Sequence, residues 1–125
     1  MSKYSVVNSE FVAWAQEAAE RIQQGEAHPY HAVLCDPPYA LAFMGSEWDS
    51  LGDGKKYQAW TTEWAKVLLP LLYPGALCFI FGGTRTWHRL ACGLEDSGFE
   101  IWDTLMWLHG QGFPKSLNVG CKCDG

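Results

Sequence analysis

The stretch His31-Ala-Val-Leu-Cys-Asp-Pro-Pro-Tyr39 decides the fold. The four apolar residues at 32–35 predict a short buried strand that ends at Asp36. Two prolines follow, and they interrupt both a hydrogen-bonded ladder and a helix. Because Asp36 precedes a proline, its backbone is biased toward an extended conformation. The stretch therefore predicts a stiff loop at the carboxyl end of a strand, which is the edge of an open α/β sheet where ligands bind.

This loop presents groups that suit an aromatic amine. The lone pair of such an amine is delocalised into the ring, so the nitrogen is a poor nucleophile until acceptors hold its two hydrogens. The Asp36 carboxylate and the Pro37 carbonyl are candidate acceptors, and Pro38 stiffens the loop. Tyr39 can stack on the base, a contact worth roughly 1–3 kcal/mol in proteins that bind single strands. These parts can hold an extruded base for attack on an electrophile.

Asp36-Pro-Pro-Tyr39 is also the signature of amino-directed DNA methyltransferases, and the chain resembles that family. The resemblance covers roughly residues 31–120 and is to phage-type enzymes whose catalytic motif precedes the cofactor motif. Further segments agree with the family in order and spacing: Phe43-Met-Gly, Trp48-Asp49, and the stretches at 72–76, 81–90, 95–101 and 112–116.

The resemblance implies a Rossmann-like methyltransferase sheet of the α/β class. We expect a partial sheet of about three or four strands with helices on both faces. The implied activity is transfer of a methyl group from S-adenosylmethionine, the cofactor, to the exocyclic amine of adenine in DNA. Aspartate at the first motif position favours adenine, whereas enzymes for the cytosine amine often have serine there. A cytosine-amine enzyme and a non-catalytic remnant that acts as a binding module are the alternatives.

The family's usual cofactor cradle, roughly Phe-x-Gly-x-Gly, does not occur in this sequence. Gly82-Gly83 is the nearest glycine cluster, but it follows a later strand. Only Asp36 then remains as a cofactor contact. We expect residues 1–120 to be the catalytic half of a methyltransferase domain, followed by a disordered tail at 121–125. Because half a sheet leaves an open apolar edge, we also expect a homo-oligomer, a complementary half, or a strand at 4–7 that covers it.

Two further segments supply candidate substrate contacts. The glycine-rich residues 40–56 are either a lid that brings Trp48 to the base or a surface connection anchored by Trp48. By resemblance, Phe113 and Lys115 lie near the target base, although Phe113 can also pin its loop to the core.

Hydrophobic spacing predicts the remaining elements along the chain. They are a strand at 4–7, helices at 11–22 and 57–72, a strand at 76–81, a helix that begins at Thr84 or Thr86 and closes at Gly98, and a strand at 99–109.

Composition indicates which partners, compartment and metal sites to expect for this chain. The net charge of −5 argues against non-specific nucleic-acid binding by this piece alone, since phosphate contacts need clustered Lys and Arg. The longest apolar region, 67–81, is interrupted by two prolines and a glycine, so we expect no membrane span. Five cysteines without a spaced framework predict free thiols and a cytoplasmic protein. Cys121 and Cys123 supply two of the four ligands of a structural zinc site, so we expect no metal.

Overall fold

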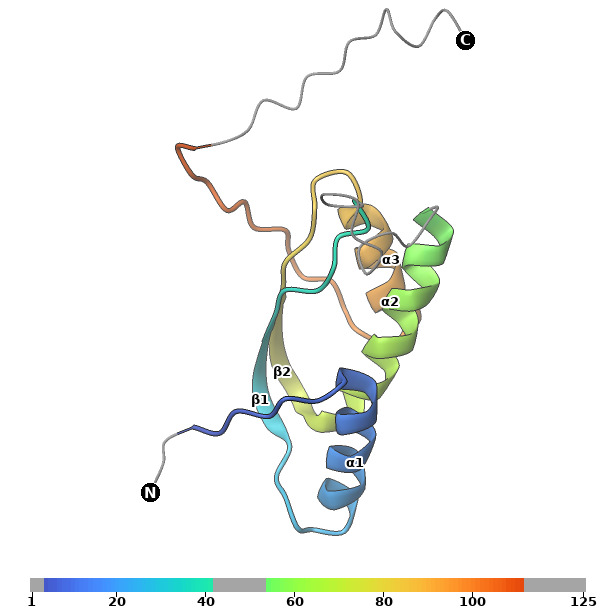
Figure 1. Ribbon diagram of the computed structural model, residues 1–125, viewed down its shortest axis with the longest axis vertical. Helices are drawn as coiled ribbons and strands as arrows, with labels where there is room; N and C mark the ends of the chain where they lie inside the picture. The colour runs from blue at the N-terminus through green and yellow to red at the C-terminus, as the bar shows by residue number, and fades with distance from the viewer. Residues whose placement is uncertain (1–3, 42–53, 112–125) are drawn as a thin grey trace, which may run out of the picture.

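The computed structural model describes residues 4–41 and 54–111 (Figure 1). Along the chain it contains the helix α1 (Phe11–Gln23), the strand β1 (Tyr30–Cys35), the helix α2 (Gly54–Leu68), a 3-10 turn η3 (Leu69–Leu71), the strand β2 (Leu72–Ile80) and the helix α3 (Trp87–Asp96).

The strands β1 and β2 pair in parallel, with Leu34 opposite Phe79 and Cys35 opposite Ile80. A parallel pair needs a crossover connection, and α2 provides it. The register shifts between Tyr30 and Ala32, where β2 contains additional residues around Gly75. Gly75 has a φ of 83°, a conformation that glycine adopts readily.

The predicted helices and the two central strands are confirmed, with shifted ends. The helix expected at 57–72 ends at Leu68, because Pro70 allows only the short turn η3 to follow. The helix expected to begin at Thr84 or Thr86 has Thr86 as its N-terminal cap residue, and Gly98, with a φ of 104°, lies just past its end.

Two predicted strands are wrong. Residues 4–7 and 99–109 have no strand structure, and the sheet has the two strands β1 and β2 in the part of the chain that the structure describes. A strand exists only through hydrogen bonds to a neighbour, and alternating apolar residues alone do not provide one. The second segment instead contacts the residue that follows β2, where the ring of Trp107 meets that of Phe81 at 5.9 Å between centroids.

Figure 1 shows the three α-helices on one side of the sheet. The expected three or four strands with helices on both faces are therefore not what the described residues form. Val33 and Ile80 face the helices and pack against the core. On the opposite face Leu34 is 75% exposed, and Leu77 and Phe79 are about half exposed. Parallel sheets are normally covered on both faces, so this apolar face adds to the open sheet edge from which self-association or a complementary half is expected, and that expectation stays a prediction.

The core lies between the sheet and the helices, with α2 at its centre. Five residues of α2 are buried, and they pack with residues of α1, η3 and α3: Ala15, Tyr57, Thr61, Trp64, Ala65, Leu68, Leu71, Leu90 and Leu94. Among residues 4–41 and 54–111, none of the helices is long and apolar enough to cross a membrane.

The helices α2 and α3 approach each other closely at Gly93. A Cβ atom added there would lie 2.7 Å from the Thr61 Cβ and 2.8 Å from the Gln58 carbonyl oxygen. The neighbouring Thr62 hydroxyl donates to the carbonyls of Gln58 at 3.0 Å and Gly93 at 3.3 Å. The Thr61 hydroxyl, in contrast, is buried without a hydrogen-bond partner. The absence of a side chain at Gly93 therefore sets the distance between the two helices.

Gly93→Ala should destabilise the fold. Alanine favours a helix over glycine by roughly 1 kcal/mol, but overpacking typically costs about 1–3 kcal/mol, and backbone atoms of α2 cannot move aside cheaply. We expect a net loss in the free energy of unfolding, measured by urea denaturation. Gly110→Ala is the control, because nothing lies within 4 Å of a Cβ there. Equal stability of the two variants would contradict the close approach.

Thr61→Val should stabilise the fold by about 1 kcal/mol, because it removes a buried hydroxyl that has no partner. Thr62→Val is the matched control: it makes the same chemical change one residue along α2 and loses a hydroxyl that donates to two carbonyls. We expect it to lower the free energy of unfolding by about 1 kcal/mol. Thermal denaturation of both variants measures the difference, and a loss of stability in Thr61→Val would refute this assignment.

Candidate functional site

The loops that follow β1 and β2 leave the same end of the sheet (Figure 1). This arrangement follows from parallel pairing, which places both carboxyl ends at one edge. The pairing continues one step beyond the strands, since the Phe81 N–H donates to the Cys35 carbonyl at 2.9 Å. The tetrapeptide from Asp36 to Tyr39 therefore starts beside the glycine-containing loop that leads from β2 to α3.

Asp36 and Tyr39 are joined directly. The Tyr39 hydroxyl donates to Oδ1 of Asp36 at 2.6 Å, and the Asp36 side chain is exposed while Tyr39 is half-buried. Burial of the phenol, followed by the hydrogen bond to Asp36 and its negative charge, raises the pKa of Tyr39 to about 12. The phenol is therefore a neutral donor at physiological pH and orients the carboxylate. A carboxylate has two oxygens and about four lone-pair positions, so Asp36 can still accept from a ligand.

Two hydroxyl groups hold the backbone of the tetrapeptide. The Tyr57 hydroxyl, from the first turns of α2, donates to the Pro38 carbonyl at 3.0 Å. The Thr86 hydroxyl, from the cap of α3, donates to the Tyr39 carbonyl at 2.8 Å. Pro37 is buried, and no described residue donates to its carbonyl. Of these three carbonyls, that of Pro37 is the one that accepts from no described residue.

The loop after β2 approaches the tetrapeptide at Gly83. A Cβ added to Gly83 would lie 3.3 Å from Oγ1 of Thr86 and 3.4 Å from the Cβ of Tyr39. Ala40, which directly follows the tetrapeptide, has a φ of 56°, a backbone conformation uncommon for a residue other than glycine. The chain thus turns sharply after Tyr39 while Thr86 holds the Tyr39 carbonyl.

Sequence reasoning missed the support that Tyr57, Gly83 and Thr86 give to this loop. The available signal was the pair of parallel strands that both end in loop-forming residues, because such loops meet at one edge. Which side chains bridge the two loops depends on the positions of α2 and α3, which the sequence pattern does not specify.

The glycines at 82–83 do not fit the main cradle of S-adenosylmethionine. A Cβ on Gly82 would lie 2.9 Å from Cδ2 of Leu90 and 3.8 Å from the backbone of Trp87, so the protein itself fills the space. The space beside Gly83 is likewise filled, in part by Tyr39 of the tetrapeptide. Among the described residues, these two glycines therefore leave no open space for the cofactor, and the expected absence of the main cradle stays a prediction.

Cys35 adjoins the tetrapeptide but is not suited to nucleophilic chemistry. Burial raises the pKa of its thiol, and the charges of Asp36 and Cys78 raise it further. A thiol attacks as the thiolate, so a raised pKa makes Cys35 less reactive.

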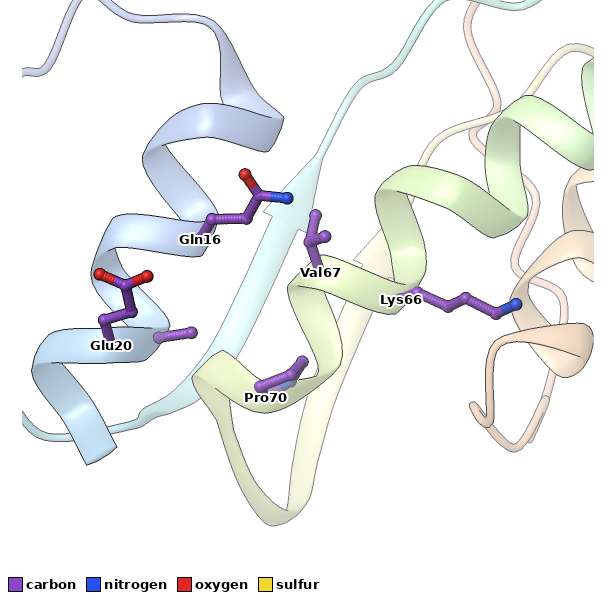
Figure 2. A pocket seen from close by; sticks show the side chains of 6 residues that line it. Gln16, Glu20, Lys66, Val67 and Pro70 are labelled. Carbon is purple, nitrogen blue, oxygen red and sulfur yellow. The ribbon is translucent and has the colours of Figure 1, made fainter.

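Two pockets among the described residues lie away from the tetrapeptide loop. One open pocket lies between α1 and the end of α2, where Figure 2 shows Gln16 and Glu20 across from Val67 and Pro70, while the Lys66 side chain points away. A second is lined by Ser5, Val7, Ser9, Phe11, Trp14 and Tyr30. Neither contains a residue of the tetrapeptide, so the Asp36 carboxylate is presented on the surface at the edge of the sheet rather than inside either pocket.

The other predicted substrate contacts, Trp48, Phe113 and Lys115, lie outside the described residues. The same holds for the tail at 121–125. Their roles stay predictions.

Comparison with known proteins identifies a family. The family model for N6/N4 DNA methylases matches residues 30–120, from the first residue of β1 onward. No curated protein and no solved structure matches the chain. The matched region takes in both strands, the tetrapeptide loop and the two helices that hold it, and it spans well over half of the sequence. The chain therefore belongs to the DNA methylase family.

Proposed function

We propose that this chain holds the target base of a DNA methyltransferase, with S-adenosylmethionine as the methyl donor and the exocyclic amine of adenine as the acceptor. The observation that carries the proposal is the arrangement of acceptors at one loop. Asp36 is exposed with one oxygen fixed by Tyr39, and the Pro37 carbonyl accepts from no described residue. Membership of the DNA methylase family supports DNA as the substrate.

The proposed chemistry is a division of the two amine hydrogens between two acceptors. One hydrogen of the amine donates to Asp36, in a charge-assisted bond that is about twice as strong as a neutral one. The other donates to the Pro37 carbonyl. Both bonds would draw the nitrogen toward a tetrahedral geometry, which localises its lone pair for direct attack on the methyl carbon of the donor. The nitrogen–carbon bond would form as the methyl–sulfur bond breaks, and S-adenosylhomocysteine would leave without a covalent enzyme intermediate. The methylated aromatic amine then loses a proton easily, so no dedicated base is needed.

Tyr39 has two roles in this proposal. Its hydroxyl keeps the Asp36 carboxylate oriented, and its ring stacks on the base that Asp36 holds. Trp48, Phe113 and Lys115 are further candidate contacts to the substrate. Other residues of the protein fill the space beside Gly82 and Gly83, so we assign the main cofactor contacts to another segment or chain. Asp36 is the proposed cofactor contact among the described residues.

Expression of the full chain in cells that lack DNA base methylation should yield N6-methyladenine, measured by mass spectrometry of nucleosides from the chromosomal DNA. Asp36→Ala should lower the product by roughly 100-fold or more, similar to the loss of one preorganised polar group in other active sites. Glu17→Ala is the control, because Glu17 is an exposed carboxylate on α1.

Two other outcomes of this expression experiment would change the proposed function in different ways. N4-methylcytosine in place of N6-methyladenine would keep the methyltransferase and refute adenine as the substrate. An unmodified chromosome, with soluble folded protein and no binding of S-adenosylmethionine in calorimetry, would favour either the non-catalytic binding module or a catalytic half that needs a complementary chain.

The titration of Tyr39 tests the link to Asp36 without an activity assay. The folded-state pKa of about 12 lies above the ordinary value of 10.0, so the associated stabilisation is complete below pH 10 and is lost as the pH rises toward 12. In Asp36→Ala the pKa should move back toward 10.0, leaving the part that burial causes. NMR of the labelled tyrosine ring measures both values, and an unchanged pKa in the variant would argue against the bond.

A further inference from the structure

We infer that Tyr57 and Thr86 are positioning residues that determine which backbone carbonyl of the tetrapeptide faces the amine. This inference rests on the proposed function and extends it to residues that do not touch the base. The two hydroxyls occupy the carbonyls of Pro38 and Tyr39, and the Pro37 carbonyl is left without a donor among the described residues.

The first support is that the two donors come from different elements. Tyr57 lies on α2 and Thr86 at the start of α3, and they are 19 and 47 residues away in sequence from the carbonyls that they hold. The Tyr57 side chain is completely buried, so its ring has little freedom to turn its hydroxyl elsewhere. The carbonyls are therefore fixed against the rigid part of the fold rather than by the loop itself.

The second support is the unusual use of Thr86. A threonine at the N-terminal cap of a helix typically accepts a hydrogen bond from a backbone N–H of the first turn, which stabilises the helix by about 1 kcal/mol. The Thr86 side chain makes no such bond in α3. Its hydroxyl instead donates to Tyr39 at 2.8 Å, across the space that Gly83 leaves open. The helix cap thus contributes to the tetrapeptide loop rather than to its own helix.

For the reaction, these two hydrogen bonds affect which carbonyl accepts the second amine hydrogen. The carbonyls of Pro38 and Tyr39 already accept from Tyr57 and Thr86, so the Pro37 carbonyl is the one that offers both lone pairs to the second hydrogen of the amine. Without the Thr86 hydroxyl, the Tyr39 carbonyl is released and the loop can turn about Ala40, which already has a positive φ. The acceptors then shift relative to the amine, and a displacement of about 1 Å can lower a rate by roughly 100-fold.

The test compares three variants that each lose one hydroxyl: Thr86→Val, Tyr57→Phe and Thr62→Val. The last is the matched control, since Thr62 also donates to backbone carbonyls but at the contact between α2 and α3. Steady-state methyl transfer by the full chain, with S-adenosylmethionine and unmethylated DNA, should show kcat lowered by about 10- to 100-fold in the first two variants. KM for DNA should change little, and Thr62→Val should lose stability but keep kcat. Thr86→Ser, which keeps the hydroxyl, should restore kcat.

Wild-type kcat in both Thr86→Val and Tyr57→Phe would overturn the positioning role and leave the proposed function intact. Equal losses in those variants and in Thr62→Val would also overturn it, because the effect would then follow stability.

A wild-type chain that transfers no methyl group counts against activity of the chain without a complementary half, and the positioning role is then decided by the Tyr39 titration. Release of the loop in Thr86→Val should admit water to the phenol and lower its pKa from about 12 toward the ordinary value of 10.0, with Thr86→Ser unchanged. The same pKa in wild type and Thr86→Val would refute the inference.

Discussion

The parallel pairing of β1 with β2 is the constraint on which the site depends. It brings the ends of two strands to one edge, so that residues far apart in sequence meet at the loop after Cys35. The tetrapeptide provides the acceptors, the loop at Gly83 approaches it, and hydroxyls from α2 and α3 hold its backbone. Rearrangement of either strand would separate the acceptors from the groups that orient them.

The single-sided packing of the fold has a second consequence. The helices bury one face of the sheet, and the other face leaves Leu34, Leu77 and Phe79 in contact with solvent. The site lies at the carboxyl edge between these two faces. An interaction that covers the apolar face would therefore adjoin the tetrapeptide loop without needing to displace α2 or α3.

The sequence was sufficient for those elements that local patterns determine. Apolar spacing located α1, α2 and α3, and a short apolar run that ends in two prolines located β1 and its loop. The segment at 99–109 shows the limit of such reasoning, because its alternation resembles a strand but a strand also requires a partner. The hydrogen bond from Thr86 to Tyr39 could not be predicted from the sequence either, because it joins residues 47 positions apart and depends on how α3 packs.

The two hydrogen bonds from an adenine amine to Asp36 and Pro37 can be observed by an NMR titration of the chain with two short single-stranded DNAs, one with adenine and one with N6,N6-dimethyladenine at the same position. The side-chain carboxyl of Asp36 and the carbonyl of Pro37 are followed by their carbon-13 shifts. Both signals should move with adenine and stay in place with the dimethylated base, which has no amine hydrogens to donate. Equal shifts with the two DNAs, or a shift at the Pro38 carbonyl instead of Pro37, would contradict the account.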